Sequence, residues 1–290
     1  IMKVNDSSEM RKIIYESDTN GDRIFHVTSL SQTKEIIEVT WLKIKEILDD
    51  RNTEREFLMM RGKLHRIALV NAAKNQNPGV FPWMLKTCLD YFDYSLVYVE
   101  IYDLKKIFFE KDSENASLIS TIFTFATDEK VDAILNEIHE KFNEFIENEM
   151  LKLRGPYDRN LLTLMVINNS ELSIVEYCWN LFEKMNEKLP QLKSHIKSTQ
   201  NKNFQRMISD VDAFGFNLLQ LSAAFSTCEV FEFVWCRTEQ LLSSKSKMKS
   251  FLTIKCQNKK NLLLMALNNQ DPYIFDAILD IYTLQLTKNE

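Results

Sequence analysis

The side chains that could carry acid–base or nucleophilic chemistry are few and far apart in the sequence. The four histidines are His26, His65, His139 and His195, and none belongs to an H-E-x-x-H motif or stands beside a cysteine in a recognisable nucleophile motif. The sequence contains no P-loop and no G-x-G-x-x-G stretch. Because an active site needs titratable groups that converge in one pocket, we expect no enzyme activity, no catalytic residue and no cofactor.

Signals for metal binding and disulfide formation are equally weak. Five cysteines occur, an odd number, and none is spaced C-x-x-C, so neither a disulfide framework nor a zinc site is indicated. We therefore predict no metal ligand, and we expect buried thiols in an intracellular protein of the cytoplasm or nucleus. The cysteines are Cys88, Cys178, Cys228, Cys236 and Cys256.

The stronger candidates for function are side chains suited to binding a protein partner. They lie in predicted turns, where core packing gives bulky apolar or cationic groups little reason to occur. Aromatic side chains and arginine dominate binding hot spots because they offer a large contact area at modest entropic cost. The alternative is that these turns pack on one another. The candidates are Asp22, Arg23, Tyr157, Arg159, Phe214, Phe216, Lys259 and Lys260.

The elements that must hold these side chains are predicted to be helices. Of the 290 residues, 45% are hydrophobic and 27% are charged, which is typical of a folded protein. Only five glycines and five prolines occur, which argues against a sandwich, a barrel or a glycine-rich nucleotide fold. We therefore predict an all-α fold. No apolar run approaches the roughly 18 residues of a membrane span, so we expect no membrane insertion.

An internal repeat organises the chain into six copies. In each copy two apolar anchors lie 12 or 13 residues apart, whereas successive copies begin 43, 51, 43, 57 and 44 residues apart. A constant inner spacing with a variable outer spacing indicates that a helix pair is the repeated unit and that the linker after it tolerates insertion. The first anchors are Ile24, Ile67, Leu118, Leu161, Leu218 and Leu262.

Two further features recur with the pairs. A short apolar segment precedes five of the six pairs and predicts a third helix under each of them. Its copies are residues 57–60, 107–109, 150–153, 204–208 and 251–254. The four tryptophans fall at or near one position of the second helix, which predicts core packing between copies. They are Trp41, Trp83, Trp179 and Trp235.

The fifth copy carries a family likeness. Residues 212–224, DAFGFNLLQLSAA, resemble the ankyrin-repeat pattern of Asp, two residues, Gly, one residue and then T-P-L-H-x-A-A. Asp212 could bond the amides of the turn, and Gly215 could take the positive φ that the turn needs. Residues 18–26 keep the Asp, the Gly and the His of this pattern, so that the resemblance implies a structural role for His26 in bonding the turn.

The departures from the ankyrin pattern are substantial. Asp and Gly are absent from the copies that begin near Leu118, Leu161 and Leu262, and the family's period of about 33 residues is shorter than every interval here. An armadillo or HEAT-like array, with repeats of about 40 to 47 residues, is the rival architecture. The ankyrin resemblance implies a right-handed solenoid that forms one repeat domain over residues 1–290. The expected repeats are 18–61, 62–111, 112–154, 155–209, 210–255 and 256–290.

The resemblance implies a non-catalytic scaffold for protein–protein interaction, which binds through its turns and first helices. Two alternatives remain open. The chain starts at Ile1, so it could be the regulatory repeat portion of a larger enzyme, channel or toxin. Residues 237–260 hold Arg237 and six lysines against Glu239, which could bind nucleic acid. A solvated linker explains that segment better, because it lacks arginine forks and exposed aromatic residues between its lysines.

Overall fold

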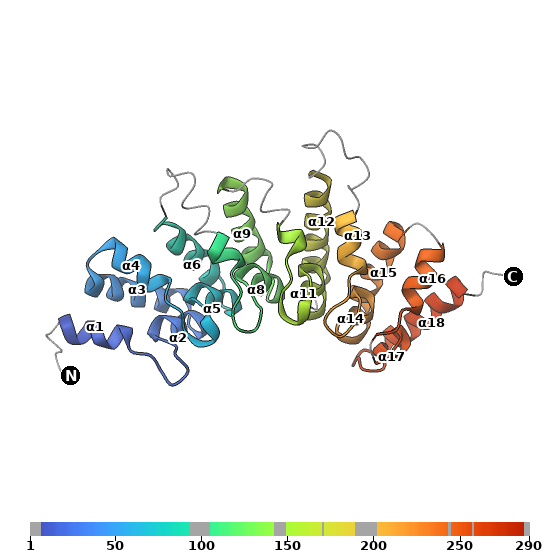
Figure 1. The fold of residues 1–290 in the computed structure, drawn as a ribbon, viewed down its shortest axis with the longest axis horizontal. Helices are drawn as coiled ribbons and strands as arrows, with labels where there is room; N and C mark the ends of the chain where they lie inside the picture. The colour runs from blue at the N-terminus through green and yellow to red at the C-terminus, as the bar shows by residue number, and fades with distance from the viewer. Residues whose placement is uncertain are drawn as a thin grey trace. The chain divides into compact units, whose positions relative to one another are not determined.

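The computed structural model describes residues 7–92, 105–141, 149–169, 171–188, 202–242, 245–256 and 258–286. These residues form helices joined by turns, and they contain no β-strand beyond two isolated bridges, Arg154 with Asn160 and Val211 with Asn217 (Figure 1). The predicted all-α class is therefore confirmed for the described part of the chain. Within it, every helix is too short or too polar to cross a lipid bilayer.

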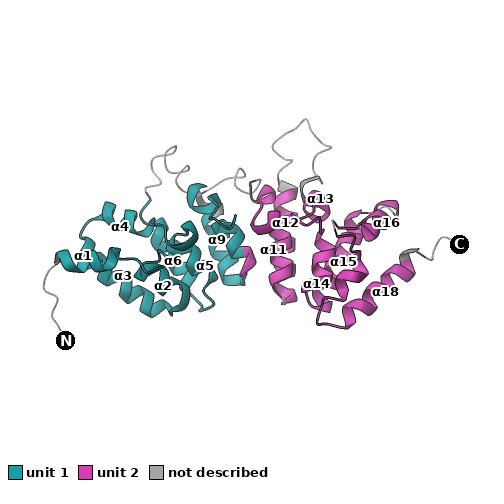
Figure 2. Ribbon diagram, turned by 60° about the horizontal axis from the view of Figure 1, so that its bottom comes forward, with its two compact units in different colours: residues 1–122, 127–141 teal, residues 123–126, 142–290 magenta. Residues whose placement is uncertain are grey.

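The chain divides into two compact units (Figure 2). Unit 1 comprises residues 1–122 and 127–141, and unit 2 comprises residues 123–126 and 142–290. The single repeat domain expected from the sequence stays a prediction.

The helices of unit 1 follow the expected order of a short helix, a longer helix and a further short helix. They are α1 (Ser7–Tyr15), α2 (Ile24–Ser31), α3 (Lys34–Leu48), α4 (Arg51–Leu58), the 3-10 helix η1 (Lys63–His65), α5 (Ala68–Lys74), α6 (Val80–Leu89), a helical segment at residues 105–109, α8 (Leu118–Thr124), whose last residues belong to unit 2, and α9 (Asp128–Lys141).

Unit 2 repeats this order. Its elements are a helical segment at residues 149–152, η2 (Pro156–Asp158), α11 (Leu161–Asn168), α12 (Leu172–Lys188), α13 (Lys202–Ser209), α14 (Leu218–Phe225), α15 (Cys228–Leu242), α16 (Lys245–Thr253), α17 (Leu262–Ala266) and α18 (Tyr273–Leu286). The predicted third helix is present before each of the five pairs as α4, residues 105–109, residues 149–152, α13 and α16.

The six first helices are α2, α5, α8, α11, α14 and α17. Five of them begin at the predicted anchor, but α5 begins at Ala68, one residue after the predicted Ile67. Ile67 is instead the N-cap residue of α5, with an extended backbone. Its side chain is apolar and only 5% exposed, so in the sequence it continues the apolar pattern of the helix.

Successive first helices pack against one another inside each unit, α2 on α5 in unit 1, and α11 on α14 and α14 on α17 in unit 2. The second helices form another layer, in which α3 contacts α6, α6 contacts α9, and α12 contacts α15. A helix enclosed by neighbours is apolar on all sides. This explains α11, in which the six residues from Leu161 to Val166 are all buried.

Asparagines after the second, fourth and sixth first helices tie each of these copies to the copy before it. Asn75 Nδ2 donates to the carbonyl of Ser29 at 3.0 Å, and Asn269 Nδ2 donates to the carbonyl of Ala223 at 3.1 Å. Asn169 makes the same kind of bond to the end of α8. These bonds satisfy carbonyls at a helix C-terminus, which otherwise have no intrahelical partner.

Three of the four tryptophans are core residues, as predicted. Trp41 is 3% exposed and packs on Phe25, with ring centroids 5.3 Å apart, and Trp179 is fully buried against Phe204 at 5.4 Å. Trp235 is also buried. Each such aromatic pair adds about 0.5–1.5 kcal/mol beyond its buried area.

The prediction of buried thiols is correct only in part. Cys88, Cys178 and Cys256 are buried, but Cys228 is half-buried and Cys236 is exposed. Burial raises the pKa of the Cys88 thiol to about 12, so this thiol stays protonated and unreactive near neutral pH. Cys236 lies in α15, on a side of the helix that is exposed to solvent.

Candidate functional site

Each first helix is preceded by a turn of five residues with the same backbone hydrogen bond. The N–H of the first residue donates to the carbonyl of the fifth at 2.8–3.1 Å. We number these turns 1 to 6 in chain order. They span residues 18–22, 62–66, 112–116, 155–159, 212–216 and 256–260, of which residue 257 lies outside the described part.

The fourth residue of every turn has a left-handed backbone. In turns 1 and 5 it is glycine, Gly21 with φ 89° and Gly215 with φ 81°. In the other four turns it is His65, Asn115, Asp158 or Lys259, with φ between 59° and 64°. A left-handed conformation costs a residue with a side chain roughly 1–2 kcal/mol. The sequence pattern of Asp and Gly therefore identifies two turns of a set of six.

The odd-numbered turns share an aspartate as their first residue. Asp212 Oδ1 accepts the amides of Phe214 at 2.9 Å and Phe216 at 3.0 Å, as predicted for this turn. Asp18 and Asp112 accept the amides at the same two positions of turns 1 and 3. The expectation that the third copy lacks this aspartate is wrong for the turn itself.

Turns 2 and 4 begin with glycine instead, at Gly62 and Gly155, and each contains two consecutive left-handed residues. A Cβ atom on Gly62 would lie 2.3 Å from Asp22 Oδ1 and 2.7 Å from the His26 ring. Turn 2 therefore approaches turn 1 so closely that no side chain fits at its first position.

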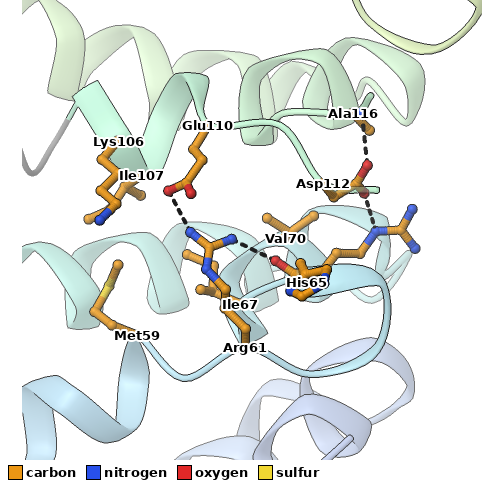
Figure 3. Close-up of a pocket in the computed structure, with 11 residues that line it drawn as sticks. Met59, Arg61, His65, Ile67, Val70, Lys106, Ile107, Glu110, Asp112 and Ala116 are labelled. Atoms are coloured by element: carbon orange, nitrogen blue, oxygen red, sulfur yellow. Dashed lines mark hydrogen bonds and ion pairs between the residues drawn. The ribbon is translucent and has the colours of Figure 1, made fainter. Parts of the chain in front are cut away.

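Paired arginines join turn 2 to turn 3. Arg61, just before turn 2, forms an ion pair with Glu110, and its guanidinium also donates to the carbonyl of His65 at 2.7 Å (Figure 3). Arg66, the last residue of turn 2, forms ion pairs with Asp112 and Glu114 of turn 3.

The cavity beside these pairs holds about 20 Å³, which is room for one water molecule. The side chain of Asp112 at its edge is only 4% exposed. This seam is therefore a packed joint between turns, too small for a ligand.

The same charged arrangement recurs between turn 4 and turn 5. Arg154, just before turn 4, pairs with Asp210, and Arg159, its last residue, donates to Asp212 at 3.2 Å. In both junctions the arginines precede and end one turn, while the acids stand two residues before the next turn and at its first position. A backbone bond from the second residue of the later turn accompanies them, as from Ala213 to the Tyr157 carbonyl at 2.9 Å.

The candidate residues of turn 1 make contacts inside the protein. Asp22 Oδ1 accepts the amide of Lys63 at 2.8 Å, and the Arg23 guanidinium donates to the carbonyls of Tyr15 at 3.2 Å and Arg61 at 3.0 Å. Both side chains are half-buried. They hold turn 1 to turn 2, which is the packing of turns on one another that the sequence left as the alternative.

The candidates of turns 4 and 5 form one exposed aromatic cluster. The rings of Tyr157 and Phe214 lie 5.8 Å apart, and the Arg159 guanidinium carbon lies 5.0 Å from the centre of the Tyr157 ring. Tyr157 is 59% exposed and Phe214 is 46% exposed, whereas Phe216 is half-buried. We call Tyr157 and Phe214 the aromatic tip.

The candidates of turn 6 are less distinctive. Lys259 is exposed and has a left-handed backbone, and Lys260 is half-buried, with its carbonyl bonded to the amide of Cys256 at 3.1 Å. The structure thus brings together Tyr157, Arg159 and Phe214, while the candidates of turns 1 and 6 lie in other copies. Their part in partner binding stays a prediction.

His26 has the structural role that the resemblance implies. Its Nδ1 accepts the Arg23 amide at 3.4 Å, so Nε2 carries the proton and donates to the carbonyl of Met60 at 3.0 Å. Burial lowers the pKa of this imidazole. Gln220 makes the equivalent hydrogen bond in the fifth copy, where its Nε2 donates to the carbonyl of Ile254 at 3.0 Å.

A larger open groove of about 460 Å³ lies between α3, α4 and α6 in unit 1. Trp83 lines it and is only half-buried, so its predicted place in the core is wrong. Its position in the sequence, two residues away from that of the other tryptophans, is the signal for this difference. The remaining lining residues are Glu38, Trp41, Leu42, Lys45, Arg51, Thr87, Asp90 and Tyr91.

The residues that the structure describes contain no group of three His, Cys, Asp or Glu side chains that could hold a metal ion. Two pairs of adjacent acids in the sequence, Asp49–Asp50 and Asp128–Glu129, lie at helix ends. Asp50 caps α4 by accepting the Thr53 amide at 2.9 Å, and Glu129, in the first turn of α9, accepts the Gly79 amide at 2.8 Å.

Comparison with known proteins leaves the family open. The sequence matches no protein-family model and no curated protein. Its structure is similar to one chain of the solved structure described as the Bd0816 predatory endopeptidase from Bdellovibrio bacteriovorus in complex with immunity protein Bd3460. That similarity has a TM-score of 0.44 and 13% sequence identity, and it covers 95% of this chain and 100% of that chain. Similarity at this level assigns neither a family nor a function to this protein.

Proposed function

We propose that this chain is a protein-binding scaffold, an ankyrin-like solenoid, which holds a protein partner at the aromatic tip of turns 4 and 5. The observation that carries the proposal is the exposure of Tyr157 and Phe214 at a junction whose internal bonds do not need them. Arg159 and Asp212 already join the two turns.

The architecture supports a scaffold. Six turn-and-helix units with the same backbone hydrogen bond follow one another, and first helices pack on first helices within each unit. Such repeats place their turns in a row and offer an extended surface without a catalytic pocket. The right-handed, ankyrin-like form of the array is part of this proposal.

The chemistry of the aromatic tip suits a protein surface. Two rings and a guanidinium provide apolar area, π faces and hydrogen-bond donors at little entropic cost, which is the composition of binding hot spots. The neighbouring Val211 is also 44% exposed and extends the apolar area along turn 5. A partner with an apolar side chain flanked by carboxylates would complement this surface.

The matching junction of turns 2 and 3 supplies a control. Leu64 stands there at the position of Tyr157, and Glu114 at that of Phe214, where it pairs with Arg66. We would compare the parent chain with Tyr157→Ser/Phe214→Ser and with Leu64→Ser/Glu114→Ser in affinity purification from native extract. Partners would be quantified by mass spectrometry and the fold checked by circular dichroism.

The proposal predicts that a partner bound to the parent chain and to the Leu64→Ser/Glu114→Ser variant is lost from the Tyr157→Ser/Phe214→Ser variant. Purified, that partner should bind the folded aromatic-tip variant at least about ten-fold more weakly, since loss of an aromatic hot spot costs 2 kcal/mol or more. Equal binding to both variants would refute this site. Binding that weakens steeply with salt and follows Lys247 and Lys249 would instead favour nucleic acid.

A further inference from the structure

The first helices of copy 1, in unit 1, and of copy 6, in unit 2, expose different faces. At the first and fourth positions of these helices, all residues in copies 2 to 6 are buried, with at most 6% exposure. In copy 1 the same positions hold Ile24 and Val27, each 47% exposed. In α5, which packs directly on α2, Asn71 at the fourth position donates to the carbonyl of His26 at 3.1 Å, so this side meets the preceding copy. We call Ile24 and Val27 the leading face.

The last copy shows the opposite face. At the third and sixth positions of the first helix, all residues in copies 1 to 5 are at most 7% exposed. In copy 6 these positions hold Leu264, which is 47% exposed, and the C-cap residue of α17, Leu267, which is 65% exposed. The third-position side chains His26 and Gln220 bond the carbonyls of Met60 and Ile254, close to the next turn, so this side meets the following copy. We call Leu264 and Leu267 the trailing face.

Both faces are apolar and exposed. Exposed apolar surface of this kind marks an interaction site. Within each unit, successive first helices pack on one another, α2 on α5, α11 on α14 and α14 on α17. The two exposed faces correspond to the two sides of these internal interfaces.

The charges beside these faces match in the same register. Lys255 precedes turn 6 as Arg61 and Arg154 precede turns 2 and 4. Lys260 ends turn 6 as Arg66 and Arg159 end their turns.

The complementary acids stand in the first copy. Glu16 lies two residues before turn 1, where Glu110 and Asp210 lie before turns 3 and 5, and Asp18 begins turn 1. Glu16 and Asp18 are exposed, whereas the side chain of Asp212, the counterpart of Asp18, is 1% exposed under its arginine. In copy 6 Lys255 is exposed and Lys260 is half-buried, and in copy 1 both Glu16 and Asp18 are exposed.

We propose that copies of this chain associate head to tail, with the trailing face of one copy on the leading face of the next. Lys255 and Lys260 of one copy would pair with Glu16 and Asp18 of the other, as the arginines of turns 2 and 4 pair with the acids of the following turns. The interface joins two different surfaces, so association continues into open chains of copies unless a ring closes. The aromatic tip takes no part in this association.

Sedimentation velocity over a range from low micromolar to submillimolar protein tests the proposal. The parent chain should grow into species larger than a dimer as its concentration rises. Leu267→Glu blocks the trailing face and Val27→Glu blocks the leading face, so each variant alone should stay monomeric. Their mixture should stop at a one-to-one dimer, because only one good face of each kind remains. These residues are exposed, so the variants should fold, which circular dichroism verifies.

A charge exchange provides a second and independent measurement. Lys255→Glu and Glu16→Lys should each weaken self-association by about ten-fold, in line with the loss of one interfacial ion pair. Mixing the two variants should restore it at a one-to-one ratio, since each then meets the opposite charge. A parent chain that is monomeric throughout, or a mixture of Leu267→Glu with Val27→Glu that does not dimerise, would overturn the proposal.

Discussion

The junction of turns 2 and 3 and the junction of turns 4 and 5 have the same charged skeleton but different tips. In each, one arginine precedes the earlier turn, another ends it, and both reach acids of the later turn. The tips differ because Glu114 forms an ion pair with Arg66, whereas Phe214 lies against Tyr157. The comparison separates residues that join turns from residues that the joint does not need.

The largest effect should come from breaking the shared skeleton. Arg159→Ala should lower the free energy of unfolding by about 3 kcal/mol, because it leaves the Asp212 carboxylate buried without its cation. Arg66→Ala should cost a similar amount through Asp112. Urea unfolding followed by circular dichroism measures both. Arg206→Ala is the control, since that side chain is 74% exposed and should contribute less than about 0.5 kcal/mol.

A loss below about 1 kcal/mol in both arginine variants would mean that the turns are held by their backbone bonds alone. A large loss in only one of them would break the equivalence of the two junctions. Either outcome would also weaken the argument that Lys260 and Asp18 complete a third junction of this kind.

An intermediate effect on stability should appear at the fourth, left-handed residue of turns 3 and 5. Gly215→Ala in turn 5 should destabilise the protein by about 1 kcal/mol, because a side chain is strained at φ 81°. Asn115→Gly in turn 3, at φ 64°, should be neutral or stabilise by up to about 1 kcal/mol. Thermal unfolding of the two variants measures these changes. A loss of stability in Gly215→Ala with no loss in Asn115→Gly would support the same backbone in both turns, whereas a loss in both variants would contradict it.

The smallest effect on stability should come from His26, which lies at a junction without paired arginines. His26 has a pKa below its ordinary value of 6.5 because it is buried, so the folded state binds its proton less readily than the unfolded state. The parent chain should therefore lose stability as the pH falls below about 6.5, while His26→Gln should not show this component. Glutamine is the appropriate replacement because Gln220 makes the same bond in the fifth copy.

Melting temperatures of the parent and His26→Gln chains at a series of pH values between neutrality and mild acid test this. The difference between the two chains should grow steadily on acidification. A constant difference would show that the imidazole is protonated already in the folded protein, or that it titrates alike in both states.

Periodicity alone was sufficient to predict the helices and to locate five of the six first helices. It failed by one residue at Ile67, because an apolar N-cap cannot be told from the first helical residue by pattern. It also identified only turns 1 and 5, since the left-handed position is not glycine in the other four. The intervals between copies held a further signal. The short intervals follow the odd copies and the long ones follow the even copies, which matches the alternation of aspartate and glycine at the start of turns 1 to 5.

The sequence by itself determined the helical class, the six copies and the residue types available at each turn, because these depend on spacing within a few tens of residues. Only the tertiary structure decided which turn residues are used internally and which remain exposed. The bonds that decide this join residues far apart in the sequence, such as Asp22 and Lys63, which are 41 positions apart, or Arg159 and Asp212, which are 53 positions apart. Exposure of Tyr157 or of Leu267 likewise depends on which surfaces other helices cover, and this is a property of the packed array rather than of any local pattern.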